Sequence, residues 1–457
     1  MGANDMFFNK ISSFITNLRL TSSRIILLGF AVPIFLGTVL LVLPISSSSG
    51  LSIGWLAALF TSTSAVCVTG LVVLDTGTDF SHFGQVIILL LIQIGGLGFM
   101  TFSVLIAVIM GKKIGLKERL LIQQSSNSVT TQGVVRLSLS IFLISFIVET
   151  TGAIVLALRW ANELGTTRSI YYGIFHSVSA FNNAGFGLWP DSLSRYVGDP
   201  LVNIVISFLF IIGGIGFTVI LDLYRKRRWR DLSFHTKIVL ITSGLLCMAG
   251  FLVIFAIELF NTKTFNTLSW SERTWAAYFQ GVVTRTAGFN SIDIGAMLPA
   301  TQFFMIFLMF VGASSGSTGG GIKTTTFAVL MLSIVATIKG KKDVQLLRKR
   351  ISQDIIFRAL AVMTISLGVV LTATFLLSIT EYAHPKDFLA LLFEATSAFG
   401  TVGMSMGVTP ELSPLGKGII IITMYIGRLG PLTLALALAQ KNVKQKYRYP
   451  EDKLLIG

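Results

Sequence analysis

The stretch Ser64-Ala65-Val66-Cys67-Val68-Thr69-Gly70-Leu71 occurs, with changes, three more times in this 457-residue chain. The other copies are Ser179-Ala180-Phe181-Asn182-Asn183-Ala184-Gly185-Phe186, Val282-Val283-Thr284-Arg285-Thr286-Ala287-Gly288-Phe289 and Ser397-Ala398-Phe399-Gly400-Thr401-Val402-Gly403-Met404. Each copy places one glycine before a large apolar residue, in a polar break between hydrophobic runs. The glycines are 115, 103 and 115 residues apart, so the chain predicts four copies of a unit of roughly 110 residues.

The composition indicates a polytopic membrane protein. Hydrophobic residues make up 53% of the chain, charged residues only 12%, and the mean hydropathy is +0.77, which exceeds what a globular core can bury. Helices are expected, because unpaired backbone groups exclude open sheets from lipid. A helical span needs about 20 residues. Runs of this length occur at 25–45, 84–110, 137–158, 201–223, 238–260, 359–379 and 418–439, with an eighth, 301–338, broken in its middle.

The basic residues indicate topology rather than a nucleic-acid partner. Of the 36 Lys and Arg residues, 26 cluster at one set of predicted helix ends, and only eight lie at the opposite ends. By the positive-inside rule the basic side is cytoplasmic, so we expect a multi-pass protein of the cell membrane with both termini in the cytoplasm. An aromatic belt at the outer interface is expected from Trp55, Trp160, Trp189, Trp270 and Trp275.

Each unit reads as a membrane helix, a short amphipathic segment of about 15 residues that is too short to span, the glycine loop and a second membrane helix. We therefore predict an all-α fold in which four helix–pore-loop–helix repeats surround one central pore with pseudo-fourfold symmetry. The predicted order is a cytoplasmic N-terminus at 1–24, repeat one at 25–110, a cytoplasmic linker at 111–136, repeat two at 137–223, a linker at 224–237, repeat three at 238–340, a linker at 341–358, repeat four at 359–440 and a cytoplasmic C-terminus at 441–457.

The short segments carry helix N-terminal signals, which give them a direction. These signals are Ser52, Thr167, Ser269 with Glu272 as a capping-box pair, and Pro385 followed by Asp387. Each short helix then points its C-terminus at a glycine loop. A helix C-terminus carries about half a negative charge, so four converging ends favour a cation.

The glycine loops have the chemistry of an ion selectivity filter. Backbone carbonyls can replace the hydration shell of an alkali cation, and glycine permits the conformations that aim them inward. We predict that K⁺ is held at Val68, Thr69, Gly70, Asn183, Ala184, Gly185, Thr286, Ala287, Gly288, Thr401, Val402 and Gly403. The side chains of Thr69, Asn183, Thr286 and Thr401 could add oxygens, or could hold the loops by hydrogen bonds to their own backbone.

The roles of the charged residues beside the loops are interpreted on the basis of the same predicted pore. Arg285 precedes Gly288 by three residues, and a cation facing the pore would oppose cation passage, so its side chain is expected to point away and stabilise the filter. An acid follows every loop, which either concentrates cations at the outer mouth or is a solvated loop carboxylate. These acids are Asp75, Asp191, Asp293 and Glu411.

A second motif repeats in phase with the first and diverges in the last two units. It begins at Gly95, Gly213, Gly312 and Gly427, which are 25, 28, 24 and 24 residues after the loop glycines. In unit three a polar insert interrupts the helix, and irregular backbone at membrane depth must be surrounded by protein or water. In unit four Arg428 replaces a glycine, and a buried guanidinium needs partners. We predict a gate formed by Gly312, Ala313, Ser314, Ser315, Gly316, Ser317, Thr318, Gly319, Gly320, Gly321, Lys323 and Arg428.

With these motifs the chain resembles the potassium-translocating subunits of the Trk/Ktr/HKT superfamily, most closely the bacterial KtrB and KtrD type, over residues 20–457. The resemblance implies inward K⁺ movement, Na⁺ as an activator, and a homodimer with one pore per subunit. It also implies control by a cytosolic nucleotide-binding ring of RCK subunits of the KtrA or KtrC type. No cofactor is expected in this chain. The basic segments 225–237 and 339–358 are candidate docking surfaces for the ring, or they set topology and attract anionic membrane lipids.

Two other classes of protein are alternatives to a channel-like uptake subunit. A secondary K⁺ or Na⁺ symporter with alternating access would need charged residues near the membrane midplane. The only plausible acids are Glu149 and Glu394, which we place near the outer end or behind a pore helix. A membrane enzyme would need a cluster of catalytic side chains, which the four histidines do not supply. We therefore expect no enzymatic activity.

Overall fold

The computed structural model describes residues 22–98, 134–341, 343–347 and 349–430, with a few positions between 101 and 108. Residues 1–21 and 431–457 lie outside this part, and with them most of the predicted N-terminus at 1–24, the whole predicted C-terminus at 441–457 and most of the linker 111–136. Each repeat opens on a long apolar helix, and these are α2 (Ser22–Val42), α7 (Val134–Leu164), α11 (Phe234–Glu258) and α15 (Gln353–Thr380). In the described residues these four helices are long and apolar enough to cross a membrane, so the chain is a multi-pass membrane protein.

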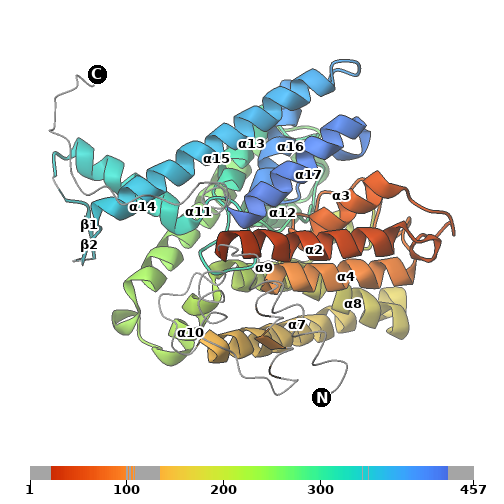
Figure 1. The fold of residues 1–457 in the computed structure, drawn as a ribbon, viewed down its shortest axis with the longest axis horizontal. Coiled ribbons are helices and arrows are strands. Elements are labelled where there is room, and N and C mark those ends of the chain that lie inside the picture. The colour runs from red at the N-terminus through yellow and green to blue at the C-terminus, as the bar shows by residue number, and fades with distance from the viewer. Residues whose placement is uncertain are drawn as a thin grey trace.

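A short helix and a second helix follow each long one. The short helices are α3 (Trp55–Val66), α8 (Thr166–Phe181), α12 (Trp270–Val283) and α16 (Phe388–Gly400). The second helices are α4 (His82–Leu97), α9 (Pro200–Ile215), α13 (Pro299–Phe310) and α17 (Pro414–Leu429). In Figure 1 the helices of the first repeat, in red and orange, lie together beside the blue helices of the fourth. The first and last quarters of the chain are therefore neighbours.

The predicted starts of the short helices were right in one repeat and wrong in detail in the others. Ser269 and Glu272 form a complete capping box at the start of α12. The other three helices begin after Gly54, Gly165 and Asp387, and none of these has a capping side-chain hydrogen bond. Both glycines have a positive φ, so here a backbone bend rather than a side chain sets the helix start.

The second helices of repeats one, two and four do not extend through their apolar runs at 84–110, 201–223 and 418–439. They end at Gly98, Gly216 and Gly430, whose φ angles are 82°, 102° and 82°. After Gly216 the chain continues as α10 (Phe217–Arg225), bent by 97° from α9. Because positive φ cannot continue a right-handed helix, the glycine motif stops the helix at the same place in these repeats.

Short elements complete the chain. After the insert in repeat three, α14 (Thr324–Ile338) leads to a hairpin of β1 (Gln345–Leu346) and β2 (Lys349–Arg350), which projects from the bundle on the left of Figure 1. The helix α15 then begins at Gln353, six residues before the predicted run at 359. Single 3₁₀ turns are η1 (Pro44–Ser46), η2 (Ser194–Tyr196), η3 (Trp229–Asp231), η4 (Phe265–Thr267) and η5 (Thr409–Glu411).

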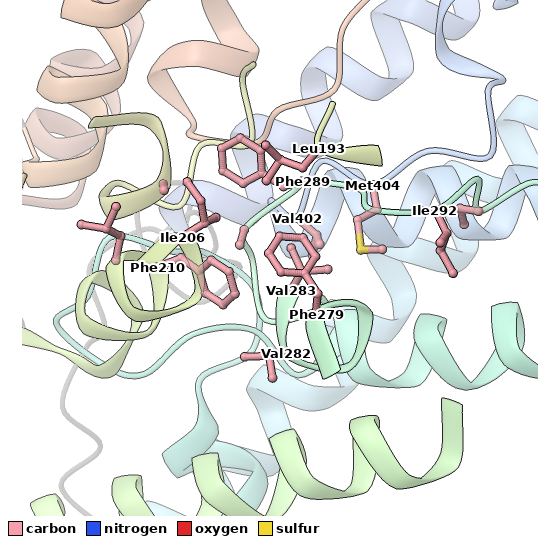
Figure 2. Packing of buried hydrophobic residues seen from close by; sticks show 14 of the residues in the cluster. Leu193, Ile206, Phe210, Phe279, Val282, Val283, Phe289, Ile292, Val402 and Met404 are labelled. Atoms are coloured by element: carbon pink, nitrogen blue, oxygen red, sulfur yellow. The ribbon is translucent and has the colours of Figure 1, made fainter. Parts of the chain in front are cut away.

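The largest buried cluster joins different repeats around the glycine loops. Figure 2 shows Val402 and Met404 of the fourth loop against Phe279, Val283 and Phe289 of the third repeat. Val402, Val283 and the two phenylalanines are fully buried. Close packing of this kind makes the position of one loop depend on its neighbour.

Buried carboxylates tie the end of one helix to the start of another. Glu258 ends α11 and is fully buried, and it accepts a hydrogen bond from the Leu298 N–H (3.0 Å) and from the Thr301 hydroxyl (2.6 Å), both at the start of α13. Glu381 ends α15 and accepts from the Ser413 hydroxyl (2.7 Å) at the start of α17. Each carboxylate thereby fixes the distance between the end of the long helix and the start of the second helix, and the short helix and its loop must fit between these two points.

The predicted aromatic belt was wrong for two residues. Trp160 is fully buried, Trp189 is only 6% exposed, and they stack edge to face at 4.9 Å. Trp55 and Trp270 are exposed, as an interfacial position requires.

Candidate functional site

The four glycine loops share one backbone conformation. The glycines Gly70, Gly185, Gly288 and Gly403 have φ angles of 91°, 70°, 75° and 89°. The residue two positions before each glycine also has a positive φ, between 49° and 69°, and these residues are Val68, Asn183, Thr286 and Thr401. Non-glycine residues seldom adopt this conformation, so its fourfold recurrence shows that the loops are built alike.

The loops lie against one another in cyclic order. A Cβ added to Gly70 would lie 2.5 Å from the carbonyl oxygen of Ala184, in the second loop, and one added to Gly288 would lie 2.6 Å from that of Val402, in the fourth. A Cβ on Gly185 would be 3.1 Å from the Ala287 oxygen, and one on Gly403 would clash with the Thr69 oxygen. Each glycine therefore faces the carbonyl that precedes the glycine of the next loop. No side chain fits there.

Hydrogen bonds to serines of the preceding short helices orient two of these carbonyls. The Gly70 N–H donates to the Ser64 hydroxyl at 3.1 Å, and the Gly403 N–H donates to the Ser397 hydroxyl at 3.1 Å. In a trans peptide the N–H and C=O point in opposite directions. When the N–H points back towards its own pore helix, the carbonyl of Thr69 or Val402 points the other way.

The surroundings of the loops favour a cation. The helices α3, α8, α12 and α16 all end at the loops, so the negative ends of four helix dipoles are directed at them. A cavity of about 460 Å³ opens beside the four glycines and is also lined by Asp75, Asp191 and Asp293. Glu411 is not among the lining residues and is paired with Lys386, a hydrogen bond that lowers the pKa of its carboxyl. Three of the four predicted acids thus lie where cations would collect.

The polar residues next to the glycines do not form one equivalent set. Thr69 directly precedes its glycine, whereas Asn183, Thr286 and Thr401 stand two positions before theirs. The side-chain amide of Asn183 donates to the Thr286 hydroxyl at 3.2 Å. The Thr401 hydroxyl accepts from the Gly320 N–H at 2.9 Å. Asn183 therefore contacts the third loop and Thr401 contacts the insert at 312–323, rather than their own backbone, which neither of the two expected roles included.

The insert is a largely buried loop that lies directly against the glycine loops. The Thr318 hydroxyl donates to the Asn183 side-chain oxygen at 2.8 Å, and the Thr318 N–H donates to the Gly213 carbonyl at 3.2 Å. The Ser314 N–H donates to the Gly214 carbonyl at 3.0 Å. Two short contacts close the loop on itself, since Val311 pairs with Ile322 and the Lys323 ammonium donates to the Gly319 carbonyl at 2.7 Å.

The predicted gate residues not yet placed lie in the same loop. Gly312 and Gly321 are buried where its two ends meet, and Ala313 bonds to Gly320 across it at 3.3 Å. The Ser317 hydroxyl donates to the Ser314 carbonyl at 2.6 Å. Gly316 has a φ of 71° and accepts from the Phe217 N–H at 3.0 Å, and Ser315 lies against Gly216.

Arg428 links this loop to the first repeat. In the last turn of α17 it donates to the carbonyls of Thr318 and Gly95, and to that of Gly96 at 3.3 Å. The two glycine carbonyls end α4, where a helix leaves its last carbonyls unpaired. No ion pair in the described part of the chain includes Arg428. The guanidinium is thus held by backbone oxygens of two repeats.

Arg285 points away from the glycines, as expected. Its side chain lines a small cavity of about 30 Å³ with Ser243 and Cys247 of α11, and none of the four loop glycines lines that cavity.

Two buried carboxylates lie beside the short helices. Glu149 of α7 accepts from the side chains of Gln93 (3.0 Å) and Asn182 (3.0 Å), at the C-terminal end of α8. Sequence reasoning missed these partners, because they are 56 and 33 residues away from Glu149.

Glu394 of α16 is fully buried and accepts from the hydroxyls of Ser405 (2.9 Å) and Thr409, which line the outer cavity. It stabilises the segment that follows the fourth loop. His176 occupies the same position in the second repeat, nine residues before its glycine, and accepts from the Leu188 N–H at 3.3 Å. The sequence alone contains this shared offset, and it could have identified Glu394 and His176 as residues that hold the segment after their loops.

The fold and this site define a membrane protein of the cation-transport class, in which four glycine loops meet. A sequence profile described as "TrkH: Cation transport protein" matches residues 25–447, and the chain belongs to this family. It is 49% identical to the Ktr system potassium uptake protein B of Bacillus subtilis (96% of this chain, 97% of that protein). It is 42% identical to the protein of the same name from Vibrio alginolyticus (95% and 94%) and 39% identical to the potassium/sodium uptake protein NtpJ of Enterococcus hirae (96% and 98%).

A solved structure has the same fold. The potassium transporter TrkH from Vibrio parahaemolyticus matches with a TM-score of 0.71 over 91% of this chain and 84% of the other, at 19% sequence identity.

Proposed function

We propose that this chain is the ion-translocating subunit of a K⁺ uptake system, in which four repeats surround one pore with pseudo-fourfold symmetry. The observation that carries the proposal is the cyclic contact of the four loops, in which each glycine faces the carbonyl before the next glycine. Carbonyl rings of this kind replace the hydration shell of K⁺. Relatives named as potassium uptake proteins, at 49% and 42% identity, support the choice of ion.

Passage is controlled, in this proposal, by the loop at 312–323 together with Arg428. Support comes from the bonds of this loop to the filter residues Asn183 and Thr401 on one side and to Arg428 on the other. A loop that is bonded to the filter residues and to Arg428 is positioned to block the path below the filter. Release of the Arg428 contacts frees this loop to move.

The partners and the orientation belong to the same proposal. The name "Ktr system" of two relatives supports a system with further components. We propose a homodimer controlled by a cytosolic RCK ring that binds nucleotide, with both chain termini in the cytoplasm. Na⁺ is proposed as an activator, supported by a relative named for potassium and sodium uptake. The division into four repeats with cytoplasmic linkers is also part of the proposal, and no cofactor is included.

The deciding experiment measures current through the purified protein in a planar bilayer with opposed K⁺ and Na⁺ gradients. We expect a reversal potential close to that of K⁺, and discrete openings when the regulatory ring is present. Saturable flux with a fixed coupling ratio and no openings would instead establish the symporter. The buried Glu149 and Glu394 are the groups such coupling would use, so the symporter further predicts that Glu149→Gln or Glu394→Gln abolishes coupling.

A further inference from the structure

A cavity of about 580 Å³ lies between the start of α7 and the helix α10. Three basic side chains line it, Arg136 from α7 and Arg225 and Lys226 from the end of α10, together with the hydroxyls of Ser140 and Thr218. The volume is in the range of pockets that hold small ligands. The filter and the insert contribute none of its lining residues, so neither accounts for this cavity.

The charge of the cavity is positive and in part unpaired. Its one carboxylate, Asp222, is already engaged by Lys226 at 3.0 Å and by the Ser233 N–H and the Thr236 hydroxyl at 2.8 and 2.7 Å. Within the described ranges, no ion pair includes Arg136 or Arg225. No described carboxylate pairs with these two guanidinium groups, and their planar donors suit a phosphate group.

The helix that carries these charges has the character of a membrane-surface helix. It is bent by 97° from the apolar helix α9, so its axis lies close to a right angle to that helix. Phe217 and Val219 are buried, whereas Tyr224 is 76% exposed and Trp229, just beyond the helix, is 51% exposed. Exposed aromatic side chains beside basic ones are typical of the interface between lipid and water.

We propose that this cavity binds the phosphate headgroup of an anionic phospholipid. Arg136, Arg225 and Lys226 contact the phosphate, the two hydroxyls donate to the rest of the headgroup, and the leucines Leu137 and Leu221 in the wall contact the start of an acyl chain. A basic pocket between membrane helices on the side of the bundle that is rich in Lys and Arg suits this ligand.

A bound headgroup is connected to the insert through one short helix. The first N–H of α10, at Phe217, donates to the Gly316 carbonyl at 3.0 Å, and Gly216 packs against Ser315. The helix is nine residues long, and its other end carries the lipid-binding charges. The expected effect on ion flux rests on the proposed gating role of the insert. The proposal that the cavity binds lipid does not depend on that role.

The test compares two triple variants of the full-length protein in lipid nanodiscs that contain phosphatidylcholine and phosphatidylglycerol. Arg136→Gln/Arg225→Gln/Lys226→Gln removes the charges in the cavity. Arg227→Gln/Arg228→Gln/Arg230→Gln removes three neighbouring exposed charges that do not line it, and serves as the matched control. Phosphatidylglycerol that stays bound after extraction is counted by native mass spectrometry, with inorganic phosphate as a soluble competitor in a second arm.

We expect the cavity variant to retain phosphatidylglycerol about tenfold less than the wild type, and the control to change less than about twofold, since charges near a membrane surface each attract anionic lipid. Equal losses in both variants, or no loss in either, would overturn the site. Full displacement by inorganic phosphate would identify a free-phosphate site instead. If the cavity variant keeps its lipid but no longer binds the regulatory ring, the surface serves a protein partner and the lipid proposal is wrong.

K⁺ flux is measured on the same samples as a separate readout. We expect phosphatidylglycerol to change the flux of the wild type and not that of the cavity variant. Lipid retention without any lipid effect on flux would leave the site intact and refute the connection through α10.

Discussion

The hydroxyl of Ser397 accepts a hydrogen bond from the Gly403 N–H at 3.1 Å, and Ser64 holds Gly70 at the same distance. Each serine stands six residues before its glycine. The second repeat keeps a serine at this offset, but the buried Ser179 hydroxyl has no partner among the described residues, and the third repeat has Val282 instead. The first and fourth loops are therefore held by bonds that the other two lack.

Replacing Ser64 and Ser397 together by alanine should reduce selectivity for K⁺ over Na⁺. Each hydrogen bond contributes about 1 kcal/mol, so we expect the flux ratio to fall about fivefold for each serine lost. Ion fluxes into proteoliposomes measure the ratio. Ser179→Ala is the matched control and should leave it unchanged, because its hydroxyl holds no glycine. An equal loss of selectivity with the control would contradict this account.

Alanine at Gly403 should abolish conduction. Its φ of 89° strains any side chain, and the added Cβ would clash with the Thr69 carbonyl and the Cα of Gly70. Gly418 is the control, because a Cβ there meets nothing within 4 Å. We expect Gly418→Ala to conduct normally and Gly403→Ala to reach the membrane without flux. Normal K⁺ flux through Gly403→Ala would show that the loop backbone does not form the path.

Arg428→Gln should raise K⁺ flux measured without a regulatory ring. The substitution removes charge-assisted bonds to the carbonyls of Thr318 and Gly95. Bonds to charged groups contribute about 1.5–3 kcal/mol, so an equilibrium between a blocked and a free insert should shift by about tenfold or more. The exposed Arg358→Gln, on α15, is the control. If K⁺ flux without the ring were unchanged in Arg428→Gln, the arginine would only hold helices together and would have no role in gating.

The sequence was sufficient to predict the repeat, the long first helices and the break in unit three, because each leaves a local signal in apolar length or glycine spacing. It was not sufficient for the ends of the second helices. Apolar residues continue past Gly98 and Gly216, and only the backbone φ reveals that the helix stops there.

Side-chain roles near the filter were harder for a different reason. Asn183 and Thr401 were interpreted from their own loops, but their partners Thr318 and Gly320 lie 135 and 81 residues away. The glycines could be assigned without such knowledge, since the requirement for a small residue is local. Long-range polar pairs such as Glu149 with Gln93 leave no pattern in a single sequence.

Glu258→Ala should destabilise the folded protein. The buried carboxylate accepts four hydrogen bonds, from Asn261, Thr264, Leu298 and Thr301, and alanine leaves these donors unpaired. We expect a loss of about 3 kcal/mol, measured by thermal denaturation in detergent, with the exposed Asp231→Ala as the control. A melting temperature within experimental error of the wild type would mean that water or a rearranged α13 satisfies these groups.

The capping box of α12 should add a pH-dependent term to stability. The Ser269 N–H donates to the Glu272 carboxylate at 2.8 Å and lowers the pKa of this group. Because the pKa is lower in the folded state, the bond stabilises at pH values above the unfolded pKa of about 4.3, and the stabilisation is lost as the pH falls through the folded pKa. Melting temperatures of wild type and Glu272→Gln should therefore differ at pH 7 and converge as the pH falls below the folded pKa of Glu272. Ser269→Ala should lower the free energy of unfolding by about 1 kcal/mol at neutral pH. A constant difference between wild type and Glu272→Gln at every pH would show that the charge of Glu272 contributes nothing to the start of this pore helix.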